Sequence, residues 1–166
     1  MNEKSIELLN RAVRDELAAV HQYMYFHFHL DDQAFDLLST LFKRTAIQEM
    51  GHVEILAERI LFLKGEVTMQ VAEDVKLVRD VDQILEMARK MEENSARDYN
   101  LWANECSANA DAVSKKIFEQ LVAEEEVHFD QFDNELDKVK QFGDRYLALQ
   151  SIERSKSLSA GPGAAE

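Results

Sequence analysis

The chain has 166 residues, 46% of them hydrophobic, which is enough for one domain with a sizeable core. Its 32 acidic residues outnumber 19 basic ones and give a formal net charge of -13, which argues against binding to nucleic acid or anionic membranes and favours the attraction of cations. The single cysteine, Cys106, excludes an intrachain disulfide and a cysteine-based zinc site, and we expect it to be a small buried hydrophobe.

Long helices are expected, because proline occurs once and glycine only five times. The first helix is predicted from about Lys4 to Asp36 and the second from about Leu37 to Lys64, where Gly65 provides a C-terminal stop. In both segments apolar residues recur at alternating steps of three and four, which keeps their side chains on one face of a packed helix.

Two more long helices and a short one follow. The third starts after Asp80, which together with Gln83 resembles a capping box. The fourth is predicted from about Asp111 to Phe142, where Gly143 breaks the pattern, and a short fifth helix from Asp144 to about Arg154. No apolar run approaches the length of a membrane span and the N-terminus lacks a signal-peptide pattern, so we expect a cytoplasmic protein.

The connections predict how the helices are arranged. Few residues join the first helix to the second or the third to the fourth, and short loops make antiparallel neighbours. The stretch from Glu66 to about Arg79 can span at most about 46 Å, and a helix of about 27 residues is roughly 40 Å long. We therefore predict an all-α, ferritin-like four-helix bundle with one long crossover between helices two and three. This domain would cover residues 1–154 and be followed by a flexible tail, 155–166.

A glutamate interrupts the apolar face of each long helix, and these four residues are Glu16, Glu49, Glu92 and Glu125. A buried unpaired carboxylate costs on the order of several kcal/mol, so four of them in one core need a shared compensating charge, which metal cations supply. His52 lies three residues after Glu49, and His128 lies three residues after Glu125. At this spacing both members of each Glu-x-x-His pair point inward from one helix face.

The spacing of the glutamates supports a metal centre most strongly. Glu49 follows Glu16 by 33 residues, and Glu125 follows Glu92 by the same number. Any one of these glutamates alone would more often be a solvated surface residue. Together, two lone glutamates and two Glu-x-x-His pairs form the ligand set of di-iron carboxylate bundles, and this mixture suits iron or manganese better than calcium.

Four segments of the chain match the motifs of one known family. They are 10–23 (NRAVRDELAAVHQY), 48–52 (QEMGH), 124–128 (EEEVH) and 143–150 (GDRYLALQ). They resemble the first-helix motif, the two Glu-x-x-His motifs and the short terminal helix of the bacterioferritins. The resemblance covers roughly residues 1 to 152.

The resemblance implies an iron-storage ferroxidase. Glu49 and Glu125 would bridge two iron ions, and O2 or H2O2 would take the electrons. The ferric product would move to a mineral inside a homo-oligomeric shell of about 24 subunits, from which a ferredoxin-like reductant could release it. The ligands implied for the two ions are Glu16, Glu49, His52, Glu92, Glu125 and His128.

Two further residues have an expected role at this site. Tyr23 lies seven residues after Glu16 on the same face, where it would hydrogen-bond a ligand or donate an electron; a plain core aromatic is the alternative. Met50 occupies the place of the methionine that ligates haem b in bacterioferritins, where two copies clasp one haem at a two-fold subunit interface. The alternative for Met50 is a methionine that fills a gap at an interface.

Three other interpretations stay open. A shell-less di-iron oxidase or peroxidase of the erythrin type would use the same six ligands, but it would need an external reductant. A mini-ferritin that consumes peroxide would place its ligands between subunits, and often carries a basic tail. A metal-free helical interaction module leaves the four glutamates in apolar faces unexplained.

Overall fold

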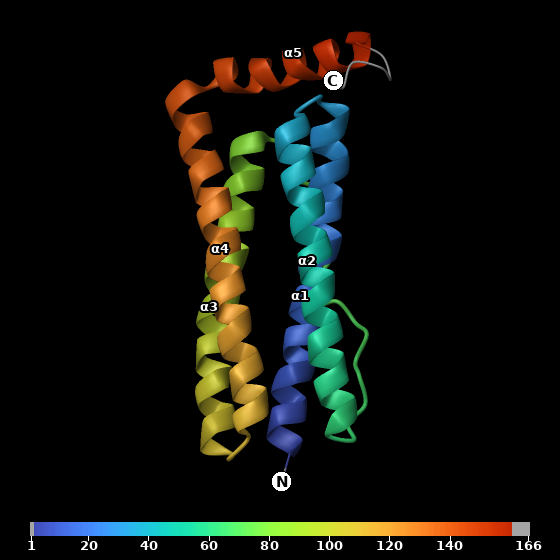
Figure 1. Cartoon of the computed structure of the whole chain (residues 1–166), viewed down its shortest axis with the longest axis vertical. Helices are drawn as coiled ribbons and strands as arrows, with labels where there is room; N and C mark the ends of the chain where they lie inside the picture. The colour runs from blue at the N-terminus through green and yellow to red at the C-terminus, as the bar shows by residue number, and fades with distance from the viewer. Residues whose placement is uncertain (1, 161–166) are drawn as a thin grey trace.

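The computed structural model describes residues 2–160, and these fold into five helices without a strand. Four long helices form a bundle and a fifth lies across one end of it (Figure 1). The predicted all-α class and ferritin-like architecture are confirmed. No helix among the described residues combines the length and the apolar character that crossing a bilayer requires. The helices are α1 (Glu3–Asp32), α2 (Asp36–Phe62), α3 (Val81–Ala108), α4 (Ala112–Phe142) and α5 (Asp144–Ala160).

The long helices pack as two antiparallel pairs, α1 with α2 and α3 with α4 (Figure 1). α1 ends at Asp32, earlier than predicted, because the chain turns at Ala34, whose φ is 62°. The turn between α3 and α4 repeats this geometry at Ala110, with a φ of 56°. In each turn the amide N–H that follows the alanine donates to a carbonyl five residues back, which is the Schellman pattern for ending a helix.

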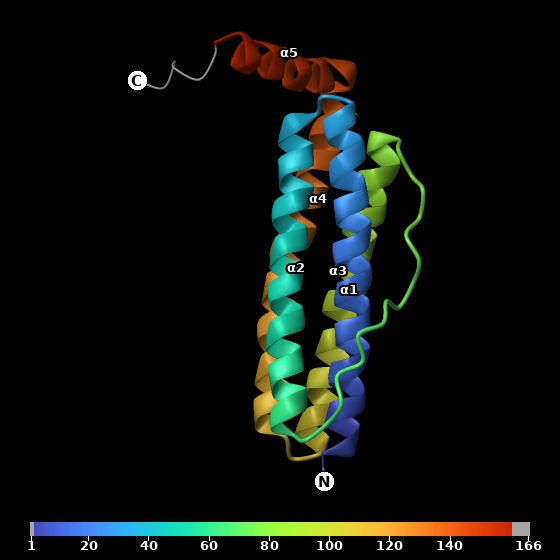
Figure 2. The same cartoon turned by 90° about the vertical axis from the view of Figure 1, so that its right-hand side faces the viewer.

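The long crossover, residues 63–80, runs along α1 on the outside of the bundle (Figure 2). Two side-chain amides of α1 hold it there by pairing with its backbone. Asn10 donates to the Glu66 carbonyl at 2.9 Å and accepts from the Thr68 N–H at 2.7 Å. Gln22, which is buried, pairs with both backbone groups of Lys76 at 3.0 and 2.8 Å. These amides satisfy backbone groups that have no sheet or helix partner.

The fifth helix closes the end of the bundle where α1 turns into α2. Gln150 accepts a hydrogen bond from the Leu38 N–H at 3.3 Å, and Arg154 donates to the Asp31 carbonyl at 2.5 Å. The helix continues to Ala160, so its predicted end at about Arg154 is wrong and residues 155–160 are helical. Serine hydroxyls bond back to carbonyls inside this helix, as Ser159 does to Ser155 at 2.9 Å, so small polar residues are accommodated. The rest of the predicted tail, 161–166, lies outside the described residues.

The apolar core is divided into two clusters. One is centred on Leu9, Leu56 and Phe118, and the other on Phe26, Phe42 and Phe132. Neither cluster contains the four glutamates, although each glutamate is 2% exposed or less. A polar layer across the middle of all four long helices therefore separates the two parts of the core.

Candidate metal centre

The polar layer contains all six of the side chains that the sequence nominates as metal ligands. They fall into two overlapping groups whose oxygen and nitrogen atoms lie within 4.8 Å of one another. Glu49 and Glu125 belong to both groups, as expected of residues that bridge two ions. The first group is Glu16, Glu49, His52 and Glu125, and the second is Glu49, Glu92, Glu125 and His128.

Several atoms of this layer have no hydrogen-bond partner although they are buried. They include both carboxylate oxygens of Glu49, Oε1 of Glu125 and the Nδ1 atoms of His52 and His128. The His52 Nδ1 lies 2.8 Å from a Glu49 oxygen and 3.1 Å from a Glu125 oxygen, and the His128 Nδ1 lies 3.0 Å from the other Glu49 oxygen. Ligands about 2.1 Å from one ion stand roughly 3 Å apart, so these atoms fit the space around a bound cation.

The carboxylate of Glu124, which lies outside the layer, orients His52. Glu124 accepts from the His52 Nε2 at 2.7 Å and from the Gln120 side chain at 2.8 Å. Because Nε2 holds the proton in this bond, the lone pair of Nδ1 would be directed at a metal bound in the layer. Glu124 is not predicted as a site residue from the sequence, since helical periodicity gives no signal for a residue that contacts the outer side of a candidate ligand.

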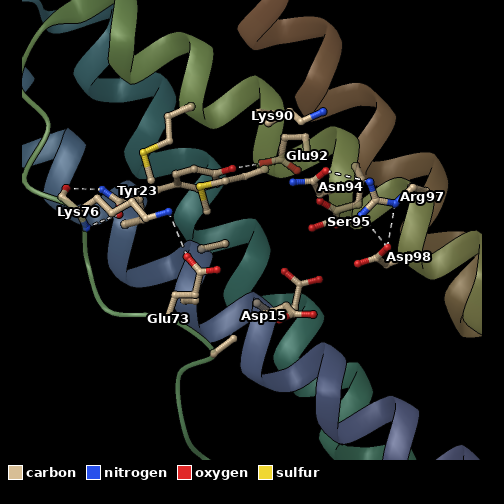
Figure 3. Close-up of a pocket in the computed structure, with 18 of the residues that line it drawn as sticks. Asp15, Tyr23, Glu73, Lys76, Lys90, Glu92, Asn94, Ser95, Arg97 and Asp98 are labelled. Atoms are coloured by element: carbon tan, nitrogen blue, oxygen red, sulfur yellow. Dashed lines mark hydrogen bonds and ion pairs between the residues drawn. The ribbon is translucent and has the colours of Figure 1, made fainter.

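Two buried tyrosines hold the lone glutamates. The Tyr23 hydroxyl donates to Glu92 (Figure 3), which is one of the two roles expected for Tyr23. The Tyr99 hydroxyl donates to Glu16 at 2.5 Å. Tyr99 was missed as a site residue, although a signal existed: it follows Glu92 by seven residues, as Tyr23 follows Glu16.

The tyrosines and the six candidate ligands share an approximate internal repeat. The α3–α4 pair carries the residues of the α1–α2 pair displaced by 76 positions along the chain. Each tyrosine crosses to the glutamate of the other pair, so the two halves of the layer are tied together. The repeated pairs are Glu16 and Glu92, Tyr23 and Tyr99, Glu49 and Glu125, and His52 and His128.

Burial and mutual contacts shift the pKa values of the groups in this layer. Burial, together with repulsion from neighbouring carboxylates, raises the pKa of both Glu16 and Glu92 well above the usual range. Burial alone would lower the pKa of the histidines, but interactions with the surrounding glutamates outweigh it. They raise the pKa of His128 to about 12 and that of His52 further still. For Glu125 burial is outweighed by Glu92 and the histidines, which lower its pKa.

Met50 lies outside the layer. Its side chain is 45% exposed on α2, away from the centre that its neighbours Glu49 and His52 enter. This orientation leaves the residue available to another surface, as its position next to Glu49 predicts. The prediction that it ligates haem stays a prediction. Cys106 is fully buried in the apolar cluster.

Comparison with known proteins identifies the class to which this fold and this site belong. The family model for the ferritin-like domain matches residues 6–142. Among curated proteins, the chain is 38% identical to the bacterioferritin of Desulfovibrio desulfuricans, over 96% of this chain and 89% of that protein. It is 32% identical to the bacterioferritin of Brucella melitensis, over 96% of this chain and 94% of that one.

A solved structure agrees with these sequence matches. The X-ray structure of the D. desulfuricans bacterioferritin, described with its diiron site in different catalytic states, superposes with a TM-score of 0.88 at 37% identity, and covers 89% of this chain and 86% of that one. The chain therefore belongs to the ferritin-like family, among the bacterioferritins.

Proposed function

We propose that this protein oxidises Fe(II) at a di-iron centre inside each chain and stores the ferric product. The observation that carries the proposal is the set of buried, unpartnered ligand atoms shared by two overlapping groups of residues. The relatives named bacterioferritin and the diiron site described for one of them support iron as the metal. All six candidate ligands come from one chain, which supports an intra-chain centre over a mini-ferritin site between subunits.

The geometry supports a ligand role for each of the six candidates. Two iron ions bound there would pass electrons to O2 or H2O2. Glu49 and Glu125 have oxygens in both groups, so they would bridge, while Glu16 with His52 and Glu92 with His128 would each complete one position. Nδ1 of both histidines must lose a proton to become a ligand, so loading with iron releases protons from the layer.

The tyrosines and Glu124 act on the ligands. Tyr23 and Tyr99 each restrain one lone glutamate, leaving its second oxygen to turn towards the metal. Tyr23 would also donate an electron, and the contact of its hydroxyl with Glu92 supports this role. Glu124 keeps the His52 ring in one orientation.

Storage and haem complete the proposal. A homo-oligomeric shell, with about 24 subunits, would hold the mineral, and a ferredoxin-like reductant would release it. Met50 of two chains would clasp one haem b, and its half-exposed position beside the open surface at Gly51 supports this. The cytoplasmic location remains a prediction from the sequence.

The decisive experiment combines kinetics with particle mass. Glu16→Ala and Glu92→Ala should each slow Fe(II) oxidation strongly, whereas Glu93→Gln, on the exposed face of α3, should leave the rate unchanged. Light scattering should give a mass near 24 chains, and a haem absorption band should disappear in Met50→Leu. An unchanged oxidation rate in the alanine variants would contradict the centre. A monomer or dimer with normal oxidation would instead indicate a shell-less di-iron oxidase.

A further inference from the structure

The internal repeat fails at the outer contacts of the two histidines. A shift of 76 positions matches the candidate ligands and both tyrosines of one helix pair to those of the other. The same shift matches Glu124, which bonds to His52, to Gln48 on α2. It also matches Gln120, which donates to Glu124, to Arg44. One histidine of the layer therefore has a carboxylate at its outer side, and the equivalent position for the other is occupied by an amide.

The two histidine rings differ accordingly in their outer contacts. Nε2 of His52 lies 2.7 Å from the Glu124 carboxylate, whose other oxygen accepts from Gln120 at 2.8 Å. Among residues 2–160, every polar side-chain contact of His128 is made by Nδ1 and none by Nε2. The ring of His52 is therefore fixed from both sides, whereas the ring of His128 is restrained only on the side that faces the layer.

A contact between α2 and α4 supports this assignment of Gln48. Arg44 lies one helical turn before Gln48 and donates to the side-chain oxygen of Gln131 at 3.3 Å. Gln131 is on α4, three residues after His128. The two helices are thus close enough at this level for the side chain at position 48 to contact the outer side of His128.

The inner residues do not differ in type between the two metal positions. Each position would have one lone glutamate held by a tyrosine, one histidine and the two shared glutamates. The outer contacts differ in charge, with the carboxylate of Glu124 on one side and the neutral Gln48 near the cationic Arg44 on the other. An outer carboxylate makes an imidazole a stronger ligand and attracts the cation, and its loss typically costs about 10–100-fold in affinity.

We propose that the two metal positions are unequal and are loaded in a fixed order. The position of Glu16 and His52 takes the first divalent ion and binds it more tightly. The position of Glu92 and His128 takes the second ion and binds it more weakly. Gln48 determines this difference, because it leaves His128 without an outer carboxylate. The inference rests on the proposed function and deepens it, since it assigns a separate affinity to each ion of that centre.

The test measures the binding of each ion without oxidation. Calorimetric titration of the metal-free protein with Co2+ should give two binding events whose dissociation constants differ about 10–100-fold. Gln48→Glu should tighten the weaker event about tenfold and leave the tighter one unchanged. The matched control, Gln141→Glu at an exposed position of α4, changes the net charge equally and should keep the wild-type values. In crystals loaded with one Co2+ per chain, anomalous scattering should place the ion between Glu16 and His52.

Each outcome decides one question. Equal dissociation constants in the wild-type protein, or one Co2+ divided evenly between the positions, would overturn the inequality. The same change in both Gln→Glu variants would overturn the role of Gln48. If Gln48→Glu does not fold, Glu124→Gln tests the other side and should bring the tighter event about tenfold closer to the weaker one. Wild-type protein that fails to bind two Co2+ per chain would contradict the di-iron centre itself, so the two proposals fail separately.

Discussion

At the scale of single residues, the arrangement depends on groups that contact the candidate ligands from outside the polar layer. Tyr99 illustrates this, because its hydroxyl holds Glu16 in a fully buried position. Tyr99→Phe removes the donor and leaves a carboxylate oxygen without a partner. We expect a loss of about 1–3 kcal/mol in the free energy of unfolding of the metal-free protein. Urea denaturation measures it.

The same substitution should weaken metal binding. Losing the hydrogen bond that restrains a ligand lowers the affinity for the metal about 10–100-fold, which anaerobic Fe(II) titration would detect. Tyr25→Phe, a partly buried tyrosine of α1 outside the layer, is the matched control and should bind normally. An affinity loss of the same size in both variants would mean that the hydroxyl of Tyr99 has no specific role.

Glu124 offers a second prediction at this scale. Glu124→Gln keeps an acceptor for the His52 Nε2 but removes the negative charge that stabilises a proton there. We expect Fe(II) affinity to fall about tenfold, with one of the two ions affected more than the other. Calorimetric titration resolves the two ions, and Glu126→Gln, exposed on the same helix, is the control. Equal affinities in the two variants would exclude an orienting role.

At the scale of the elements, the turns carry the backbone strain. Ala110 has a φ of 56°, a left-handed conformation that costs roughly 1 kcal/mol for a residue with a Cβ. Ala110→Gly should therefore stabilise the fold by about 0.5–1 kcal/mol. Gly143, at a φ of 54° and ψ of -134°, is the converse case: no neighbouring atom lies within 4 Å of an added Cβ, so Gly143→Ala tests backbone strain alone.

We expect Gly143→Ala to destabilise the fold by about 1–3 kcal/mol, mainly through the docking of α5. Thermal unfolding of the two variants measures both effects. A change in Tm of the same sign in both variants would contradict the assignment of strain to these φ angles.

The elements also show what the sequence could and could not predict. Apolar periodicity located the four long helices, and the Asp80 cap is confirmed by the bond from the Gln83 N–H at 3.1 Å. Apolar periodicity could not place the end of α5. The serines there are typical of a flexible tail, but their hydroxyls donate hydrogen bonds to carbonyls of the helix. The path of the crossover depends on single amides, Asn10 and Gln22, which no periodic pattern marks.

The same distinction applies to the candidate centre. Six residues stood out because a charge in an apolar face is an exception that repeats at equal spacing. Tyr99 and Glu124 did not stand out, because a tyrosine in a core or a glutamate on a helix surface is what ordinary packing predicts. The structure brings the six together, and their role as ligands remains the proposal tested above.

At the scale of the whole molecule, the buried carboxylates that would bind metal lower the stability of the fold. A core divided by a polar layer buries four carboxylates, and the metal-free protein compensates by retaining protons. The pKa values of Glu16, Glu92, His52 and His128 are all raised on folding. Above the ordinary pKa values of 4.5 and 6.5, the folded state then binds more protons than the unfolded state. The stability that these groups contribute is therefore complete below the ordinary values and is lost as the pH rises.

We accordingly expect the metal-free protein, kept in chelator, to have a lower Tm at pH 9 than at pH 7. Its free energy of unfolding should fall by at most about 1.4 kcal/mol per pH unit for each extra proton that the folded state binds. Bound metal would replace these protons, so the protein loaded with Co2+ should lose much less stability over the same range. The difference in Tm between loaded and metal-free protein should thus widen with pH. A constant difference would mean that metal binding displaces no protons from the layer, and that the charge balance of the metal-free centre is not carried by its histidines.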